Sequence, residues 1–222
     1  STGSTHLDKK YLEKNKIQLF TIQKNEKIKK IKASSEFTFG LILSSFRNLV
    51  NGTEAVKSGN WRDQEQYIRG NQMYKKTIGI IGFGRIGENI FNYAKAFGMK
   101  VIAYDPYKIK KLKKLKIFAN LNQLLSSADI VTVCVHLDNR TKLMCDDNFF
   151  HKMKKNSIFV NTSRGEIVKE NSLVKALNSK KVKSAAVDVV QNEQKINLSK
   201  NKLIQYSKEN KNLIITPHMA GL

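Results

Sequence analysis

Apolar runs alternate with amphipathic segments from Lys76 to the end of the chain, and this alternation constrains the fold more than any other feature. Most of the runs are continuously apolar, as is typical of parallel strands that are buried on both faces. We expect strands at 77–81, 100–104, 116–119, 130–135, 157–161, 184–189 and 213–216. We expect helices between them at 85–97, 108–114, 121–127, 146–154, 170–178 and 199–207. The pattern predicts an α/β domain with a doubly wound parallel sheet.

The first third of the sequence is less regular. Residues 9–16 have a helical pattern and residues 17–22 have the composition of a strand. Residues 34–58 begin with serine before an apolar run and carry Glu36 near the start, which is typical of a helix N-terminus. We therefore expect one long helix over 34–58.

The formal net charge is +22, with 34 lysines but only six arginines. A nucleic-acid surface would be expected to use more arginine, whose planar fork makes bidentate contacts with phosphates and bases. We therefore interpret the charge as solvated surface that attracts anionic ligands at long range, and expect no nucleic-acid partner. The longest apolar run, 37–46, is too short and too polar to span a bilayer, so we expect no membrane partner.

The two cysteines, Cys134 and Cys145, are too few for a disulfide framework and have no metal-ligand spacing. We expect two reduced thiols in a cytoplasmic protein, and no metal site.

A glycine-rich segment follows the run at 77–81. Gly82, Gly84 and Gly87 have the G-x-G-x-x-G spacing, with an apolar strand before them and a helical pattern after them. In that context the first glycine permits a tight turn, the second lets the backbone approach a diphosphate, and the third lets the helix pack close to the sheet. The alternative is a glycine turn with no ligand.

An acid ends the next strand. Asp105 lies 21 residues after Gly84, where a carboxylate accepts hydrogen bonds from ribose hydroxyls and repels a 2′-phosphate. The sequence therefore predicts NAD as cofactor in preference to NADP. Lys108 and Lys110 follow closely and could weaken that preference.

Four polar residues lie near the ends of the last strands: Arg164, Asp188, Glu193 and His218. Ligands of open α/β sheets bind outside the carboxyl ends of the strands, where all four should meet. Taken one at a time, each has an ordinary alternative, such as a surface ion pair, a loop acid or a hydrogen-bonded loop histidine. Their joint occurrence favours a catalytic role.

Five stretches in this order resemble the D-isomer-specific 2-hydroxyacid dehydrogenase family, which includes phosphoglycerate, glycerate and glyoxylate dehydrogenases. They are TIGIIGFGRIGENI, AFGMKVIAYDPY, FVNTSRGEIVKENSLVKAL, SAAVDVVQNE and ITPHMAG. The resemblance covers the chain from about Ser34 to its end. It implies hydride transfer between NAD and a small D-2-hydroxy acid or 2-oxo acid.

The resemblance also implies roles for residues at matching positions. Arg164 would bind the substrate carboxylate, His218 would exchange the proton, and Glu193 would hold the imidazole. Gly3 and Ser4, in a loop similar to the family's carboxylate-binding loop, would contact the substrate. Cofactor contacts are implied for Gly82, Gly84, Arg85, Ile86, Gly87, Asp105, Cys134, Val135, His136, Thr141, Thr162, Ser163, Asp188, Ala220 and Gly221.

Two departures from the family pattern concern the pocket. Gln194 follows Glu193 where the family usually has proline, and the family's His-Val-Pro reads Cys134, Val135 and His136. His136 therefore lies near the expected nicotinamide pocket, but His218 matches the position of the family's base.

The family has a second, flavodoxin-like substrate domain, of which we expect residues 1–32 to be a remnant and 33–222 to be the Rossmann NAD-binding domain. We therefore expect a fragment, or the ordered part of a longer protein, that binds NAD(H) and turns over poorly. The resemblance of 34–58 and the Trp61 segment to the family's dimerising helices implies a homodimer. A different class of function remains open, a non-catalytic NAD(H)-sensing regulator similar to the C-terminal-binding-protein corepressors.

Overall fold

The computed structural model describes residues 7–20, 28, 30–62, 65–108, 115–118, 120–195 and 197–221. The chain divides into two compact units, Ser1–Lys32 and Ala33–Leu222. The first unit contains helix α1 (Lys9–Lys14), whose first turn is capped by the carboxylate of Asp8. The interpretation of this unit as a remnant of a substrate domain stays a prediction.

The expected strand at 17–22 is wrong over residues 17–20, which form no regular element, and residues 21–22 lie outside the described part of the chain. Leu19 and Phe20 are exposed there. A strand needs a neighbour to pair its backbone groups, and apolar composition alone does not supply one.

The second unit is built on a parallel sheet, which has seven strands within the described residues, in the order β3-β2-β1-β4-β5-β6-β7. The predicted doubly wound fold is confirmed. The strand order reverses between β1 and β4, which is where such sheets bind ligands at their carboxyl edge. The strands are β1 (Thr77–Ile81), β2 (Lys100–Tyr104), β3 (Lys116–Ile117), β4 (Ile130–Val133), β5 (Ser157–Asn161), β6 (Val182–Val187) and β7 (Leu213–Ile215).

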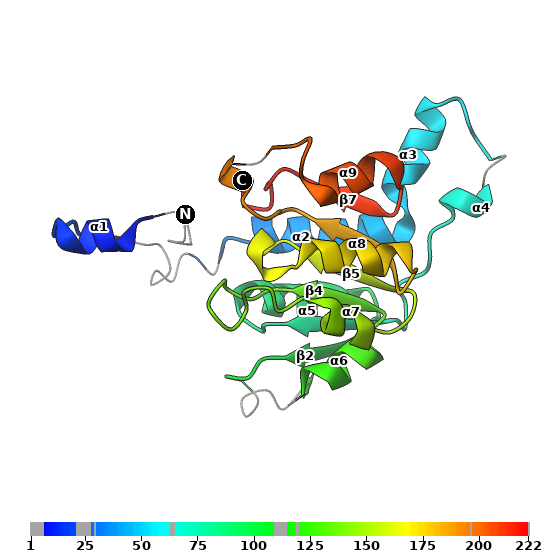
Figure 1. Ribbon diagram of the computed structural model, residues 1–222. Helices are drawn as coiled ribbons and strands as arrows, with labels where there is room; N and C mark the ends of the chain where they lie inside the picture. Colours follow the sequence, from blue (N-terminus) through cyan, green and yellow to red (C-terminus); the bar gives the residue numbers. More distant parts are fainter. Residues whose placement is uncertain are drawn as a thin grey trace. The chain divides into compact units, whose positions relative to one another are not determined.

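Helices cover both faces of the sheet (Figure 1). Helices α2 (Ala33–Arg47) and α5 (Arg85–Ala96) pack on one face. The other face is covered by α6 (Leu121–Ser127), α7 (Asp147–Lys152), α8 (Glu170–Asn178) and α9 (Lys202–Glu209). Two further helices, α3 (Leu49–Lys57) and α4 (Glu65–Ile68), follow α2 in the chain.

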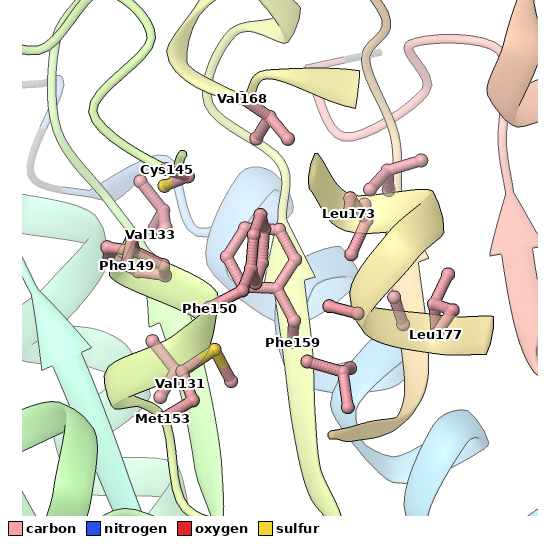
Figure 2. Packing of buried hydrophobic residues seen from close by; sticks show 14 of the residues in the cluster. Val131, Val133, Cys145, Phe149, Phe150, Met153, Phe159, Val168, Leu173 and Leu177 are labelled. Atoms are coloured by element: carbon pink, nitrogen blue, oxygen red, sulfur yellow. The ribbon is translucent and has the colours of Figure 1, made fainter. Parts of the chain in front are cut away.

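Aromatic rings fill the centre of the second face. Figure 2 shows Phe149 and Phe150 of α7 packed beside Phe159 of β5, with Leu173 and Leu177 of α8 alongside. The ring centroids of Phe150 and Phe159 are 5.2 Å apart in an edge-to-face arrangement. This packing fixes β4, β5 and α8, so the loops at their ends start from rigid positions.

Several element boundaries differ from expectation by one or more residues, strands β3, β4 and β7 for example ending earlier than predicted, and three of the differences have a clear physical cause. The helix expected over 34–58 is two helices, because Asn48 adopts a left-handed conformation with φ of 57°. Strand β6 ends two residues earlier than predicted, since its pairing with β5 stops where β5 ends, at Asn161. Helix α9 begins at Lys202, where the side chain of Asn201 accepts the backbone N–H of Ile204.

The expected helix at 108–114 lies almost entirely outside the described residues. Among the described residues, no helix combines the length and the apolar character needed to cross a membrane.

Candidate active site

Gly82 turns the chain at the end of β1. Its φ is +88°, a conformation that residues with a side chain rarely adopt. A Cβ there would lie 2.6 Å from the carbonyl oxygen of Cys134 and 2.8 Å from a side-chain carbon of Val135. The loops after β1 and β4 therefore meet at this glycine, directly at the reversal of strand order.

The two other glycines of the motif occupy different surroundings. A Cβ on Gly87 would lie 2.5 Å from the Gly82 carbonyl oxygen, so α5 packs tightly on the loop. Gly84 precedes α5, is exposed, and has nothing within 4 Å of where a Cβ would be. Arg85 and Ile86 form the first turn of α5 and are partly buried. The start of this helix is therefore open to a ligand, as a diphosphate would require.

Asp105 follows β2, and its carboxylate faces the glycine loop. One oxygen accepts the backbone N–H of Phe83 at 2.9 Å, and the other accepts that of Tyr107 at 3.0 Å. The residue is only 9% exposed. Each carboxylate oxygen can accept a second hydrogen bond, so the group remains able to bind two ribose hydroxyls.

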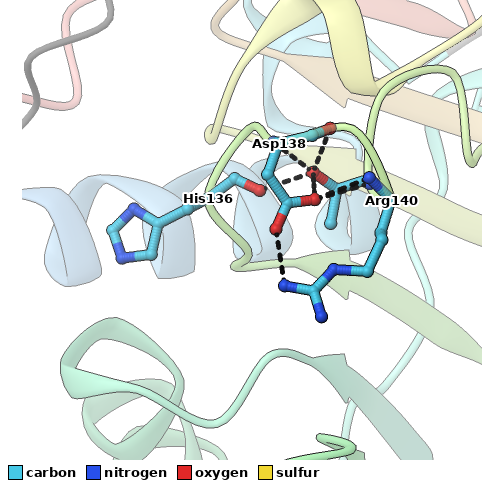
Figure 3. A network of polar contacts seen from close by, with 4 residues as sticks. His136, Asp138 and Arg140 are labelled. Atoms are coloured by element: carbon cyan, nitrogen blue, oxygen red, sulfur yellow. Dashed lines mark hydrogen bonds and ion pairs between the residues drawn. The ribbon is translucent and has the colours of Figure 1, made fainter.

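The loop after β4 is closed by a turn around Asp138, drawn in Figure 3. The carboxylate accepts the backbone N–H groups of Arg140 and Thr141, at 2.8 and 3.0 Å, and pairs with the guanidinium of Arg140 at 3.1 Å. The N–H of Arg140 is the largest of the causes that lower the pKa of Asp138. The Thr141 hydroxyl donates to the carbonyl of His136, whose exposed imidazole points away from this network.

The loop after β5 presents Arg164. The buried side chain of Asn161 accepts the backbone N–H of Ser163 and donates to the carbonyl of Arg164, both at 3.0 Å. The Ser163 hydroxyl donates to the carbonyl of Val133, and the hydroxyls of Thr162 and Thr38 are 2.7 Å apart. Sequence reasoning missed Asn161, although a polar residue at the end of a buried strand was a usable signal.

The Arg164 loop lies directly on the loop after β6. A Cβ on Gly165 would lie 2.0 Å from the backbone of Val190. The side chain of Glu166 also accepts the backbone N–H of Asn192 at 3.2 Å. Because β5, β6 and β7 are neighbouring parallel strands, Arg164, Glu193 and His218 all follow strand ends on one edge.

His218 and Glu193 form a pair across two loops. The Nδ1 atom of His218 is 2.7 Å from Oε1 of Glu193, and the two side chains are 42% and 33% exposed. His218 adopts a φ of 54° after β7. Glu193 begins a short 3-10 turn that includes Gln194, the residue that replaces the family's proline. The pairing uses Nδ1 of the imidazole, so the other ring nitrogen, Nε2, is not part of it.

Asp188 holds the loop that carries His218. Its fully buried carboxylate accepts the hydroxyl of Thr216 and the backbone N–H groups of Met219 and Ala220, the latter two at 2.9 and 2.8 Å. The N–H of His218 donates to the Asp188 carbonyl at 2.8 Å. The Asp188 carboxylate already accepts three hydrogen bonds, so a contact with the cofactor would have to be an additional one. The sequence did not predict these bonds to the His218 loop.

The remaining predicted residues are less informative. Gly3 and Ser4 lie outside the described residues, Ala220 is buried and Gly221 is exposed. Cys134 and Cys145 are both free thiols. Within the described part of the chain, no three histidine, cysteine or acidic side chains come together as a metal site would require.

The chain is similar to known proteins in sequence and in overall fold. Residues 39–220 match the family model described as D-isomer specific 2-hydroxyacid dehydrogenase, NAD binding domain. The chain belongs to this family. The resemblance inferred from the five motifs is confirmed, and NAD is the cofactor of the domain. The open start of α5 and the position of Asp105 fit that cofactor.

Two curated relatives illustrate the range of the family. The chain is 38% identical to D-3-phosphoglycerate dehydrogenase of Methanocaldococcus jannaschii over 72% of its own length and 30% of the relative's. It is 33% identical to hydroxypyruvate reductase of Thermotoga maritima over 84% of its length and 59% of the relative's. The chain thus spans less than two thirds of these relatives.

A solved structure extends the similarity. D-lactate dehydrogenase of Aquifex aeolicus, complexed with NAD and lactic acid, matches with a TM-score of 0.84 and 30% identity. That match covers 99% of this chain and 68% of the other.

Proposed function

We propose that the protein is an NAD-dependent oxidoreductase that interconverts small D-2-hydroxy acids and 2-oxo acids. The observation that carries the proposal is the 2.7 Å pairing of His218 with Glu193 on the same sheet edge as Arg164 and the cofactor loop. Reversible oxidation of a hydroxy acid requires a group that takes up and returns the hydroxyl proton and a cation that binds the carboxylate. His218, held by Glu193, can be the first group, and Arg164 can be the second.

His218 is the residue that exchanges the proton. The carboxylate of Glu193 fixes Nδ1 as the protonated nitrogen, which leaves Nε2 to accept a proton from a substrate hydroxyl or return it to a carbonyl. The same carboxylate stabilises the imidazolium that forms when Nε2 accepts that proton. When bound, the nicotinamide supplies the hydride chemistry.

Arg164 binds the substrate carboxylate in this proposal. A guanidinium has five N–H donors in a planar fork, and the Ser163 carbonyl takes one of them at 2.6 Å. The Asn161 side chain fixes the backbone from which the fork projects. Arg164 thereby orients the 2-oxo carbon and adds positive charge near its oxygen, where negative charge develops during reduction.

The test is NADH oxidation by the protein with glyoxylate, hydroxypyruvate, pyruvate and phosphohydroxypyruvate. We expect at least one to be reduced. We expect His218→Asn to lower kcat by about a hundredfold or more. Arg164→Ala should raise KM and lower kcat/KM, whereas Arg69→Ala, which removes an exposed arginine paired with Glu65 on α4, should change neither.

If no 2-oxo acid is reduced while NADH still binds, the enzymatic proposal fails and the NAD(H)-sensing regulator becomes the better account. If turnover occurs but Arg164→Ala and Arg69→Ala behave alike, the role given to Arg164 is wrong.

We also propose that the protein forms a homodimer through α3 and the segment after it. Leu49, Val50 and Val56 are exposed on or beside this helix, and Trp61 and Tyr67 are 69% and 71% exposed. Exposed apolar side chains in such number support an interface. Sedimentation should give the mass of two chains, and a monomeric mass at micromolar concentration would contradict the proposal.

A further inference from the structure

Lys108 reaches from the loop after β2 back to the glycine loop. Its ammonium donates to the carbonyl of Phe83 at 2.7 Å and pairs with the carboxylate of Glu88 at 2.9 Å. Phe83 lies between the first two glycines of the motif, and Glu88 lies in the first turn of α5. Lys108 therefore connects the loop after β2 to the glycine loop and to the first turn of α5, which together form the proposed adenosine end of the cofactor site.

Asp105 also bonds to the backbone of Phe83. Its carboxylate accepts the N–H of Phe83, while Lys108 donates to the carbonyl of that residue. The lysine is thus held beside the carboxylate that recognises ribose hydroxyls. A 2′-phosphate on that ribose would approach Asp105 and, if Lys108 were unpaired, would find a compensating cation there.

The pairing with Glu88 removes that compensation. At Phe83, the Lys108 ammonium pairs with the carboxylate of Glu88, while the carboxylate of Asp105 accepts the backbone N–H. A second cation, Arg140, is also paired with an acid. Arg140 lies over the ring of Tyr107, 5.3 Å from its centroid, and its guanidinium is paired with Asp138. Among the described residues, Lys108 and Arg140 are thus each paired with an acid.

We propose that Glu88 is a specificity-determining residue that makes the protein select NAD(H) over NADP(H). By holding Lys108, Glu88 keeps the lysine from offsetting the repulsion between Asp105 and a 2′-phosphate. The lysine instead fixes the position of the glycine loop. This inference concerns only the adenosine end of the cofactor, and so does not depend on which acid the protein reduces.

The expected effect is moderate because the pair is partly exposed. The side chains of Lys108 and Glu88 are 35% and 51% exposed, so water and salt screen their attraction. Freeing Lys108 should therefore tighten binding of a 2′-phosphate by about fivefold, and more at low ionic strength.

The experiment is calorimetric titration of the whole protein with adenosine 5′-monophosphate and adenosine 2′,5′-bisphosphate. These probes differ only in the 2′-phosphate. Glu88→Gln should tighten binding of the bisphosphate by about fivefold and leave the monophosphate within about twofold. Adding Lys108→Met in the Glu88→Gln background should abolish the gain.

The matched control is Asp147→Asn, which removes an exposed carboxylate of α7 that pairs with Lys169 at 3.2 Å. It lowers the negative charge by the same amount away from the site, so the two probes should bind as they do to the unchanged protein. Melting temperatures verify that each variant is folded.

The proposal is overturned if Glu88→Gln leaves the ratio of the two affinities unchanged, or if Lys108→Met in its background retains the gain. A gain of equal size in Asp147→Asn would show a general charge effect and would also overturn it. If the unchanged protein binds neither probe, the position of the adenosine site is wrong and this inference falls with it. Absence of 2-oxo acid turnover alone would leave it standing.

Discussion

The adenosine end and the acid–base end of the candidate site are built by different means. The adenosine end is formed mainly by the backbone, with a tight turn at Gly82 and an open helix start at Gly84. Two backbone N–H groups also hold the buried carboxylate of Asp105 there. At the other end the proposed acid–base groups are the side chains of His218 and Glu193, which are partly exposed on loops. The cofactor end is thus formed mainly by backbone geometry, and the proposed acid–base end by partly exposed side chains on anchored loops.

The largest expected effect separates the two glycines of the adenosine end. Gly82→Ala should destabilise the protein by about 3 kcal/mol or more, because it combines a φ of +88° with a Cβ 2.6 Å from the Cys134 carbonyl oxygen. Gly84→Ala should leave the melting temperature nearly unchanged, since its Cβ meets nothing within 4 Å. It should nevertheless abolish NADH binding. Thermal unfolding with and without NADH measures both effects.

If Gly84→Ala bound NADH normally, the open start of α5 would not be the diphosphate site. Equal melting temperatures for the two variants would contradict the steric account of Gly82.

Removing the two acids after β6 should affect stability to different extents. Asp188→Ala should lower the free energy of unfolding by about 2–4 kcal/mol, because it strands two backbone N–H groups and the Thr216 hydroxyl beneath the His218 loop. Glu193→Ala should change stability by less than about 1 kcal/mol, since its partner His218 is 42% exposed. Urea unfolding measures the free energy of unfolding of both variants. Similar losses for the two would refute the claim that Asp188 stabilises the loop whereas Glu193 does not.

Asn161 should act on Arg164 through the backbone. Asn161→Asp keeps the shape and the acceptor for the Ser163 N–H but loses the donor to the Arg164 carbonyl. We expect KM for the 2-oxo acid to rise about tenfold with a smaller change in kcat, because the carboxylate-binding fork is displaced. Kinetics of the variant beside Arg164→Ala would test this, and an unchanged KM would count against a positioning role.

The smallest effect concerns the two thiols, of which Cys134 lies at the end of β4 beside the glycine loop and Cys145 lies in the core. Burial raises the pKa of Cys134 to about 12, and that of Cys145 well above its ordinary value. Because the thiolate is the reactive form, both cysteines should react slowly with a thiol reagent at pH 8 and rapidly after unfolding. Fast labelling of the folded protein would show that the end of β4 is more open than the structure indicates.

Patterned segments allowed much of the fold to be predicted. Strands β1, β2 and β5 and helices α6 and α8 have the predicted bounds, because apolar continuity and helical periodicity are local properties. The break at Asn48 could not be predicted, since it depends on one residue adopting a left-handed conformation. The end of β6 depends on where its neighbour β5 ends, which is not encoded in the β6 segment.

The candidate site divides in the same way. The positions of Gly82, Gly84 and Asp105 follow from spacing, as does the expectation that Arg164, Glu193 and His218 share an edge. The bonds from Asp188 to the His218 loop, from Asn161 to the Arg164 loop and from Lys108 to Glu88 join residues that are distant in sequence. Such partners become visible only when the loops are seen together.

The most direct test is NADH titration of the double variant Glu193→Gln/His218→Asn, with turnover measured on the same samples. If binding and chemistry are built separately, the double variant binds NADH with the affinity of the unchanged protein while 2-oxo acid reduction falls about a hundredfold or more. Loss of NADH binding in parallel with turnover, or full turnover without these two side chains, would contradict the account.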